Sequence, residues 1–265
     1  MKGRRIVVLA SGRGTNLDAI INAINAKVLK AEIVGVASNK KGSGALQIAA
    51  SQNIPTLCFV HEKDKQTREE YDDHLAQGVA ALHPDLIVLA GWMRILTNTF
   101  ISQFPNIINL HPALPNTFPG ATGIQDALDA SKTAPYIKET GAMVHHVVEE
   151  VDAGEVITQV TVPIYSEDTL ETLTSRVQYF EKPILLEAVQ VVLDKMENAR
   201  NEYPKHGLIY PKDLDGIDLD DDNLVDVIVI GRDSCLQAKP TQVHTLIANS
   251  APANILSPGR EPSSG

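Results

Sequence analysis

Arg5-Ile-Val-Val-Leu-Ala10, followed directly by Ser11-Gly-Arg-Gly-Thr-Asn16, is the stretch that decides the fold class. The first segment is a short run rich in β-branched and apolar side chains, which is typical of a strand buried on both faces of a sheet. The second is a glycine-rich turn, and a helical pattern follows it from Leu17 to Ala26. Thr15, with Asp18 three residues on, predicts a capping box at the start of that helix.

The same order of strand and helix continues through the first 90 residues. Further strands are predicted at 32–38, 56–60 and 85–90, and further helices at 44–52 and 67–82. This alternation is typical of an α/β fold, a doubly wound and mostly parallel sheet with helices on both faces. Ligands bind such sheets at the carboxyl ends of the strands, where the glycine-rich turn lies.

After residue 105 the alternation gives way to strands and one long helix. Strands are predicted at 107–110, 141–149 and 155–163, a loop at 112–123 and a helix from Asp168 to about Asp194. Only an Asp-Ala-Gly turn at 152–154 separates the last two strands, which predicts a C-terminal hairpin. Pro183 interrupts the long helix, and we expect it to kink that helix.

The C-terminal part of the chain differs in composition. It holds an aspartate-rich run from Asp213 to Asp226 and ends in a stretch rich in Ser, Pro, Ala and Gly. The apolar run 225–230 predicts one strand, and residues 235–265 are predicted to be largely disordered. We therefore predict a main domain over residues 1–200 and an acidic, largely irregular or disordered C-terminal extension over residues 201–265.

Composition and charge exclude several classes of function. The formal net charge of −10 argues against nucleic acid as a partner, because such proteins usually carry a basic surface. No apolar run approaches the roughly 20 residues that a membrane span needs. The two cysteines, Cys58 and Cys235, are isolated, and no Cys/His cluster has the spacing of a metal site. We expect a cytoplasmic protein without a metal, a membrane partner or a nucleic-acid partner.

The glycine-rich turn is a candidate phosphate site. Glycines let the backbone approach a ligand closely, and free amides at a helix N-terminus attract an anion. Leu17 stands where a dinucleotide-binding fingerprint has its third glycine, and the Gly-Lys-Ser/Thr of a P-loop is absent. The turn therefore favours a mononucleotide-like phosphate over NAD. An ordinary strand–helix turn is the alternative, and the turn alone does not decide between them.

Asn109 and His111 are candidate catalytic residues. They lie two apart at the end of a strand, so both side chains point to the same face. The Asn109 amide can donate a hydrogen bond to a carbonyl oxygen, and His111 can transfer a proton there. Asp152, in the predicted turn, supplies a carboxylate that would raise the His111 pKa. Together they suit acyl transfer to an amine without a covalent intermediate, although each residue alone fits a structural role.

The other histidines attract less interest on sequence grounds. We interpret His145, on the strand before Asp152, as structural. Charged or loop surroundings predict surface positions for His61, His74, His83, His206 and His244.

From about residue 5 to residue 195 the chain resembles the phosphoribosylglycinamide formyltransferase (GAR transformylase) family, within the folate-dependent formyltransferase superfamily. Asn109-Leu-His-Pro112 with the distal Asp152 marks the superfamily, and the Gly-Arg-Gly-Thr-Asn-Leu17 turn points to the GAR branch. The other matching motifs are Arg68-Glu-Glu-Tyr71, Ala90-Gly-Trp-Met-Arg-Ile-Leu96, Pro119-Gly120, His145 to Gly154 and Arg176-Val-Gln-Tyr-Phe-Glu181. The resemblance implies a Rossmann-like formyltransferase fold and a formyltransferase catalytic domain over residues 1–200.

The resemblance also implies an activity. Such an enzyme transfers the formyl group of 10-formyltetrahydrofolate, its co-substrate, to the amine of 5'-phosphoribosylglycinamide (GAR) in purine biosynthesis. We expect small-molecule partners only, and a monomer or homodimer.

Site residues follow from the resemblance position by position. Asn109 and His111 would polarise the formyl group, with His111 as general acid and Asp152 raising its pKa. GAR would be bound by Gly14, Thr15, Asn16, Gln178 and Glu181. Formyl-folate would be bound by Arg68, Met93, Arg94, Ile95, Leu96, Asn109, Val148, Glu149, Glu150, Val151 and Asp152.

The chain departs from the family in one loop. Residues 113–120 read Ala-Leu-Pro-Asn-Thr-Phe-Pro-Gly, where the family often has Ser-Leu-Leu-Pro-Lys-Tyr-Pro-Gly, and residues 121–124 lack a histidine that many relatives carry. These differences concern loop contacts and leave the catalytic trio unchanged.

Four other classes of protein fit the sequence less well. A formyltetrahydrofolate hydrolase would carry an N-terminal regulatory domain, which a first strand at residue 5 does not favour. A methionyl-tRNA formyltransferase would carry a C-terminal barrel, and residues 200–265 are too acidic and polar for one. A non-catalytic nucleotide- or folate-binding protein that keeps the fold would not need Asn109, His111 and Asp152 together. A nicotinamide oxidoreductase would need an acidic residue after the second strand, where Ser38-Asn39 stands.

Overall fold

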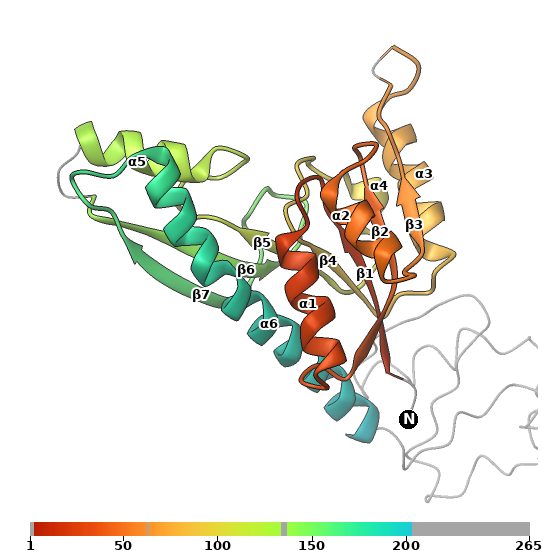
Figure 1. Cartoon of the computed structure of the whole chain (residues 1–265). Coiled ribbons are helices and arrows are strands. Elements are labelled where there is room, and N and C mark those ends of the chain that lie inside the picture. The colour runs from red at the N-terminus through yellow and green to blue at the C-terminus, as the bar shows by residue number, and fades with distance from the viewer. Residues whose placement is uncertain (1–2, 63, 134–136, 203–265) are drawn as a thin grey trace, which may run out of the picture. The chain divides into compact units, whose positions relative to one another are not determined.

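A computed structural model describes residues 3–62, 64–133 and 137–202 (Figure 1). Residues 1–195 form one compact unit, and the described part of the second unit, which begins at Met196, is the end of a helix. The strand predicted at 225–230 and the disorder predicted for 235–265 lie outside the described residues. The division of the chain after residue 200 therefore stays a prediction.

The described residues form one seven-stranded sheet with the order β3-β2-β1-β4-β5-β6-β7. The strands are β1 (Arg4–Leu9), β2 (Ala31–Ser38), β3 (Thr56–Cys58), β4 (Leu86–Leu89), β5 (Ile107–His111), β6 (Glu139–His146) and β7 (Val156–Pro163). Strands β1 to β5 pair in parallel, whereas β5–β6 and β6–β7 are antiparallel. The predicted doubly wound, mostly parallel sheet with a C-terminal hairpin is confirmed.

Six helices accompany the sheet in the described ranges. They are α1 (Thr15–Asn25), α2 (Gly44–Ser51), α3 (Arg68–Ala80), α4 (Asn98–Ile101), α5 (Gly123–Thr133) and α6 (Leu170–Glu202). Alternate side chains of β1 and β4, including Val7 and Leu89, pack with α3 and α4 in one buried cluster. Helices α1 and α6 cover the opposite face, as Figure 1 shows. Because β-branched and apolar residues line both faces of β1, the strand is buried between these two layers.

The order of the strands determines where a ligand can bind. The chain runs from β1 outward to β3, then returns and continues from β4 to β7 on the other side of β1. At such a switch point the connections after two neighbouring strands leave in opposite directions, which opens a crevice at their carboxyl ends. Residues 10–14 follow β1 and residues 90–97 follow β4, so both segments border this crevice.

Some local predictions are wrong. No side chain caps α1: its N-cap is Gly14, with φ 83°, and Asp18 instead accepts a hydrogen bond from Asn22. Helices α4 and α5 were not predicted: residues 98–101 are too few for a periodic pattern, and residues 123–133, which follow the predicted loop, were assigned no element. Helix α6 extends beyond Asp194 to Glu202 and contains Pro183 in its interior, and the kink expected at Pro183 stays a prediction.

Candidate active site

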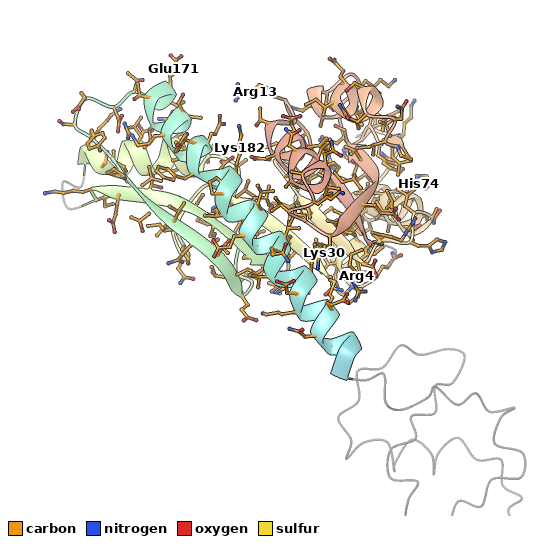
Figure 2. All side chains as sticks on the ribbon, turned by 60° about the horizontal axis from the view of Figure 1, so that its bottom comes forward. Arg4, Arg13, Lys30, His74, Glu171 and Lys182 are labelled. Carbon is orange, nitrogen blue, oxygen red and sulfur yellow. The ribbon has the colours of Figure 1, made fainter. Side chains whose placement is uncertain are left out.

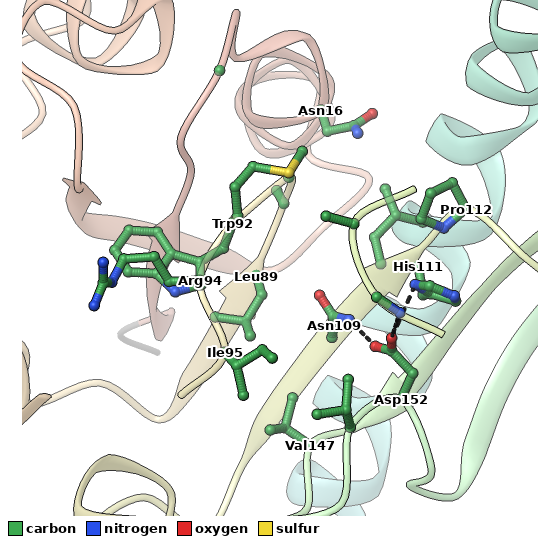
Figure 3. A pocket seen from close by; sticks show the side chains of 18 of the residues that line it. Asn16, Leu89, Trp92, Arg94, Ile95, Asn109, His111, Pro112, Val147 and Asp152 are labelled. Carbon is green, nitrogen blue, oxygen red and sulfur yellow. Dashed lines mark hydrogen bonds and ion pairs between the residues drawn. The ribbon is translucent and has the colours of Figure 1, made fainter. Parts of the chain in front are cut away.

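A pocket of about 1070 Å³ lies at the carboxyl edge of the sheet, at the switch point. Its walls come from the turn after β1, the segment after β4, the end of β5, the loop between β6 and β7, and α6. Segments that are distant in sequence therefore meet around one cavity (Figure 3).

The pocket brings together nearly all of the residues singled out on sequence grounds. Glu150 is the exception: its exposed side chain does not line the pocket, because it lies on the solvent side of the β6–β7 loop. The residues that line the pocket as expected are Gly14, Thr15, Asn16, Arg68, Met93, Arg94, Ile95, Leu96, Asn109, His111, Val148, Glu149, Val151, Asp152, Gln178 and Glu181.

Asn109 and His111 lie at the end of β5, and their side chains point to the same side because they are two residues apart. Asp152 reaches both of them from the β6–β7 loop. Its Oδ1 accepts a hydrogen bond from Asn109 Nδ2 at 3.2 Å, and its Oδ2 lies 3.3 Å from His111 Nδ1. Asp152 thus contacts both side chains that were expected to act on a carbonyl, as Figure 3 shows.

Asp152 is held in one position by its backbone and by its neighbours. Its φ of 54° is left-handed, a conformation that aspartate tolerates better than most residues. The Gly120 amide donates to Oδ2 at 2.9 Å, and the His145 ring lies 3.5 Å from Oδ1. Burial raises the pKa of this carboxyl, but these hydrogen bonds and the two nearby histidines outweigh burial and lower it. Asp152 is therefore an anion at neutral pH.

His111 is 3% exposed and lies between two acceptors. Its Nδ1 faces Asp152, and its Nε2 lies 3.1 Å from the carbonyl oxygen of Phe118. Burial lowers the His111 pKa, and this effect exceeds the increase caused by Asp152 and by the Phe118 carbonyl. Asp152 raises the His111 pKa as expected, but desolvation is the larger effect, so the net shift of the pKa is downward.

The opposite end of the pocket is formed by the turn after β1 and by α6. Asn16 Nδ2 donates to Glu181 Oε2 at 3.0 Å, and Arg13 Nη2 donates to Gln178 Oε1 at 2.9 Å. Arg13 extends from the turn on the side that faces α6 (Figure 2). Burial raises the pKa of Glu181, and the Asn16 hydrogen bond only partly offsets that increase. This end therefore combines free amides, an arginine and a buried carboxyl.

Gly14 shapes this turn. Its φ of 83° is left-handed, and a Cβ at this position would lie 2.7 Å from Ala45 Cα. A side chain would therefore be strained and would collide with α2. The close packing of turn and helix leaves the first amides of α1 directed toward the pocket.

The segment after β4 forms an apolar wall that is fixed at three points. Met93 N donates to Ser11 Oγ at 2.9 Å, Arg68 Nη2 donates to the Ile95 carbonyl at 3.1 Å, and Thr97 N donates to Asp72 at 2.6 Å. The side chains of Met93 and Ile95 remain 57% and 52% exposed. With Val148 and Val151 across the cavity, they offer two apolar surfaces suited to a flat ring.

Several pocket residues were not identified from the sequence. Arg13 belongs to the recognised turn, but no role was assigned to it. His61, predicted to lie at the surface, lines the pocket and packs edge-on against Tyr71 at 5.3 Å between ring centroids. The exposed positions predicted for His74 and His83 are confirmed (His74 is labelled in Figure 2). His206 and His244 lie outside the described residues.

His145 is the most important omission, because it touches the catalytic trio. It is 2% exposed, and its Nε2 lies 3.2 Å from Asn109 Nδ2. In the antiparallel pairing of β5 with β6, His145 is the direct partner of Asn109. The predicted strands did not include that register, so the sequence could not place the two side chains together.

Two further findings concern metal ligands and membrane spans in the described residues. Within residues 3–62, 64–133 and 137–202, no three His, Cys, Asp or Glu side chains are grouped so that they could hold a metal ion. In the same ranges, no helix is long and apolar enough to cross a membrane.

Comparison with known proteins agrees with this geometry. Residues 4–189 match the formyl transferase family, and the chain therefore belongs to that family. Its relatives include the phosphoribosylglycinamide formyltransferases of Dictyostelium discoideum, 43% identical over 72% of this chain and 98% of the relative, and of Schizosaccharomyces pombe, 41% identical over 71% and 97%. The crystal structure of phosphoribosylglycinamide formyltransferase from Bacillus halodurans matches 74% of this chain and 98% of its own, with 34% identity and a TM-score of 0.68.

Proposed function

We propose that this chain transfers the formyl group of 10-formyltetrahydrofolate to the amine of GAR, which gives N-formyl-GAR and tetrahydrofolate in purine biosynthesis. The observation that carries the proposal is the single pocket, which joins a phosphate-binding turn at one end to Asn109, His111 and Asp152 at the other. One substrate can thus be held by its phosphate while its amine reaches the formyl group of the second.

GAR binds at the end formed by α1 and α6. Its phosphate meets the amides of Gly14, Thr15 and Asn16, because a helix N-terminus favours an anion. Gln178 and Glu181 lie on one face of α6, less than one helical turn apart, and bind the ribose and the glycinamide portion. Their contacts with Arg13 and Asn16 support this assignment, since they bring the α6 residues against the phosphate turn.

The folate binds between the apolar wall and the β6–β7 loop. Met93, Arg94, Ile95 and Leu96 form one side, and the loop from Val148 to Asp152 covers the pterin ring from the other. Within that loop the Glu150 side chain faces solvent, so its contribution comes from the backbone. Arg68 lines the same end and donates to the Ile95 carbonyl, so its position is coupled to that of the wall.

The chemistry proceeds by direct attack. The amine nitrogen of GAR forms a bond to the formyl carbon, and the carbonyl oxygen takes the negative charge, which Asn109 stabilises. Burial favours the neutral form of His111, so the ring can accept the proton that the amine releases. Protonated His111 then acts as general acid and returns a proton to the folate nitrogen as the C–N bond breaks. Asp152 stabilises the charged ring and assists proton transfer through water.

The proposal also includes the compartment, the oligomeric state and the absence of a metal. The enzyme acts in the cytoplasm as a monomer or homodimer, uses no metal and needs no partner besides its two substrates. Cys58 is an exposed free thiol, which suits a reducing compartment.

The decisive experiment measures both products with purified full-length protein. Formylated GAR and tetrahydrofolate are expected in equal amounts, and both are expected to depend on GAR. Folate turnover that proceeds equally well without GAR would indicate a hydrolase and refute the transferase.

A further inference from the structure

The direction of the Asn109 amide conflicts with the role that formyl transfer requires of it. Its Nδ2 donates to Asp152 Oδ1 and lies 3.2 Å from His145 Nε2, so both amide hydrogens point into the protein. Figure 3 shows the Asn109 nitrogen turned toward Asp152 and the oxygen on the opposite side. An amide oxygen is an acceptor and cannot stabilise the negative charge of a formyl oxygen.

The His145 ring explains why the amide takes this direction. His145 Nδ1 lies 2.8 Å from the carbonyl oxygen of His146, which can only accept, so the hydrogen of a neutral ring is on Nδ1. Its Nε2 then has no hydrogen and accepts one from Asn109. Gly154 preserves this arrangement, because a Cβ at position 154 would overlap the same His146 carbonyl.

A half-turn about the Cβ–Cγ bond of Asn109 would exchange the amide nitrogen and oxygen. The nitrogen would then face the pocket as a donor, and the oxygen would face His145 and Asp152. Beside a neutral His145, that oxygen would meet only acceptors, which is unfavourable in a buried position. If His145 carries hydrogens on both ring nitrogens, the charged Nε2–H can donate to the oxygen. This charge-assisted bond offsets the contact of that oxygen with the Asp152 carboxylate, which also balances the positive charge of the ring at 3.5 Å.

We propose that His145 is a positioning residue whose protonation turns the Asn109 amide, so that the doubly protonated ring presents the donor that formyl transfer needs. This inference rests on the proposed function. The titratable groups that face His145 are Asp152 from the β6–β7 loop, His111 from β5 and His146 on its own strand. Asp152 thus serves two histidines, with Oδ1 toward His145 and Oδ2 toward His111.

Two substitutions of His145 test the roles of its two ring nitrogens separately. His145→Gln places an amide near the position of Nε2 and can donate to Asn109 at any pH. His145→Asn places its amide near the position of Nδ1 and offers nothing at Nε2. For His145→Asn we expect kcat to fall about 100-fold, the effect of removing one oxyanion donor, with little change in either KM. His145→Gln should stay within about tenfold of the wild type, because it restores that donor.

The pH profile gives a readout that a merely structural role would not move. If the doubly protonated ring is the active form, wild-type kcat should fall at high pH, whereas the His145→Gln variant should lack this decline. His146→Gln is the matched control, because its side chain does not line the pocket, and it should keep the wild-type profile. Equal rates for the Gln and Asn variants, or a decline that persists in His145→Gln, would overturn the inference.

NMR of the ¹⁵N-labelled protein tests the amide directly and needs no turnover. A coupling across the hydrogen bond from Asn109 Nδ2 to His145 Nε2 is expected at high pH and should vanish at low pH. A coupling that persists at the pH of maximal activity would refute the inference. Absence of GAR formylation by the wild type would instead refute the proposed function, so the two failures are distinguishable.

Discussion

At the proposed phosphate end of the pocket most of the expected binding groups come from one continuous turn, whereas at the proposed formyl end they come from two segments distant in sequence, β5 and the β6–β7 loop. Gly14, Thr15 and Asn16 act chiefly through backbone amides whose direction is set by β1 and α1. Asn109, His111 and Asp152 act through side chains that are positioned by contacts distant in sequence. We therefore expect changes at the phosphate end to alter binding of GAR and changes at the formyl end to alter turnover.

The largest expected effect is that of His111→Ala. Removing the proton-transfer group should lower kcat by about 10³–10⁴-fold, because general acid–base catalysis contributes on that scale. The KM for GAR should change little, since the phosphate turn is untouched. Steady-state kinetics with both substrates varied would measure this, with His74→Ala as control at an exposed position. Near-normal turnover would exclude the proposed role of His111.

Asp152→Asn should have the next largest effect. It removes the charge that stabilises protonated His111, so kcat should fall by about 10²–10³-fold while the protein still binds folate. Glu150→Gln is the matched control, because it removes a carboxylate from the same loop without altering a side chain in the pocket. Equal kinetics for the two variants would contradict the assignment. Titration calorimetry with a folate analogue would check that binding is retained.

Gly14→Ala tests the proposed phosphate end of the pocket. The new Cβ would be strained and would press on Ala45, which displaces the amides that hold the phosphate. We expect the KM for GAR to rise about tenfold or more, equivalent to about 1.4 kcal/mol, with kcat within about twofold. Gly42→Ala is the control, because Gly42 also has a positive φ, of 66°, but has open space around it and lies outside the pocket. A decrease in kcat with an unchanged KM for GAR would contradict the assignment of this turn to GAR binding.

The smallest effect on activity is expected from Asp168→Asn, at the start of α6. Arg176 donates two hydrogen bonds of 2.7 Å to Asp168 and holds the pKa of that carboxyl well below its usual range. The pair therefore stabilises the fold above about pH 4, the usual pKa of an unfolded aspartate, and loses this contribution as pH falls further. Thermal unfolding at pH 7 should show a loss of about 2 kcal/mol, with turnover of the folded fraction unchanged.

A control for this variant is available one residue away. Glu167 is exposed, and Glu167→Gln should leave stability nearly unchanged. If the two variants unfold alike at pH 7 and at pH 3, the Asp168–Arg176 pair does not contribute as expected.

The difference between the two ends also explains what could be predicted from the sequence. Strand β1 and the turn after it are local, so residues 5–16 were sufficient to identify both. Asn109 and His111 were found because they share one strand and one face. His145 and His61 were not, because their proximity to the pocket depends on strand register and on helix packing. The net direction of the His111 pKa depends on burial, which a sequence does not reveal.

Asp152 connects the site to the order in which the protein folds. Its hydrogen bonds reach Gly120 and Asn109, which are 32 and 43 residues away along the chain. Closing such loops is entropically costly and tends to come late in folding, while the turn after β1 forms from neighbouring residues. A chain emerging from the ribosome would thus complete its phosphate turn long before Asp152 has been synthesised. On the proposed function, the enzyme can therefore become active only after the β6–β7 hairpin has packed against β5. Measured activity would then indicate that the last strands of the sheet have folded.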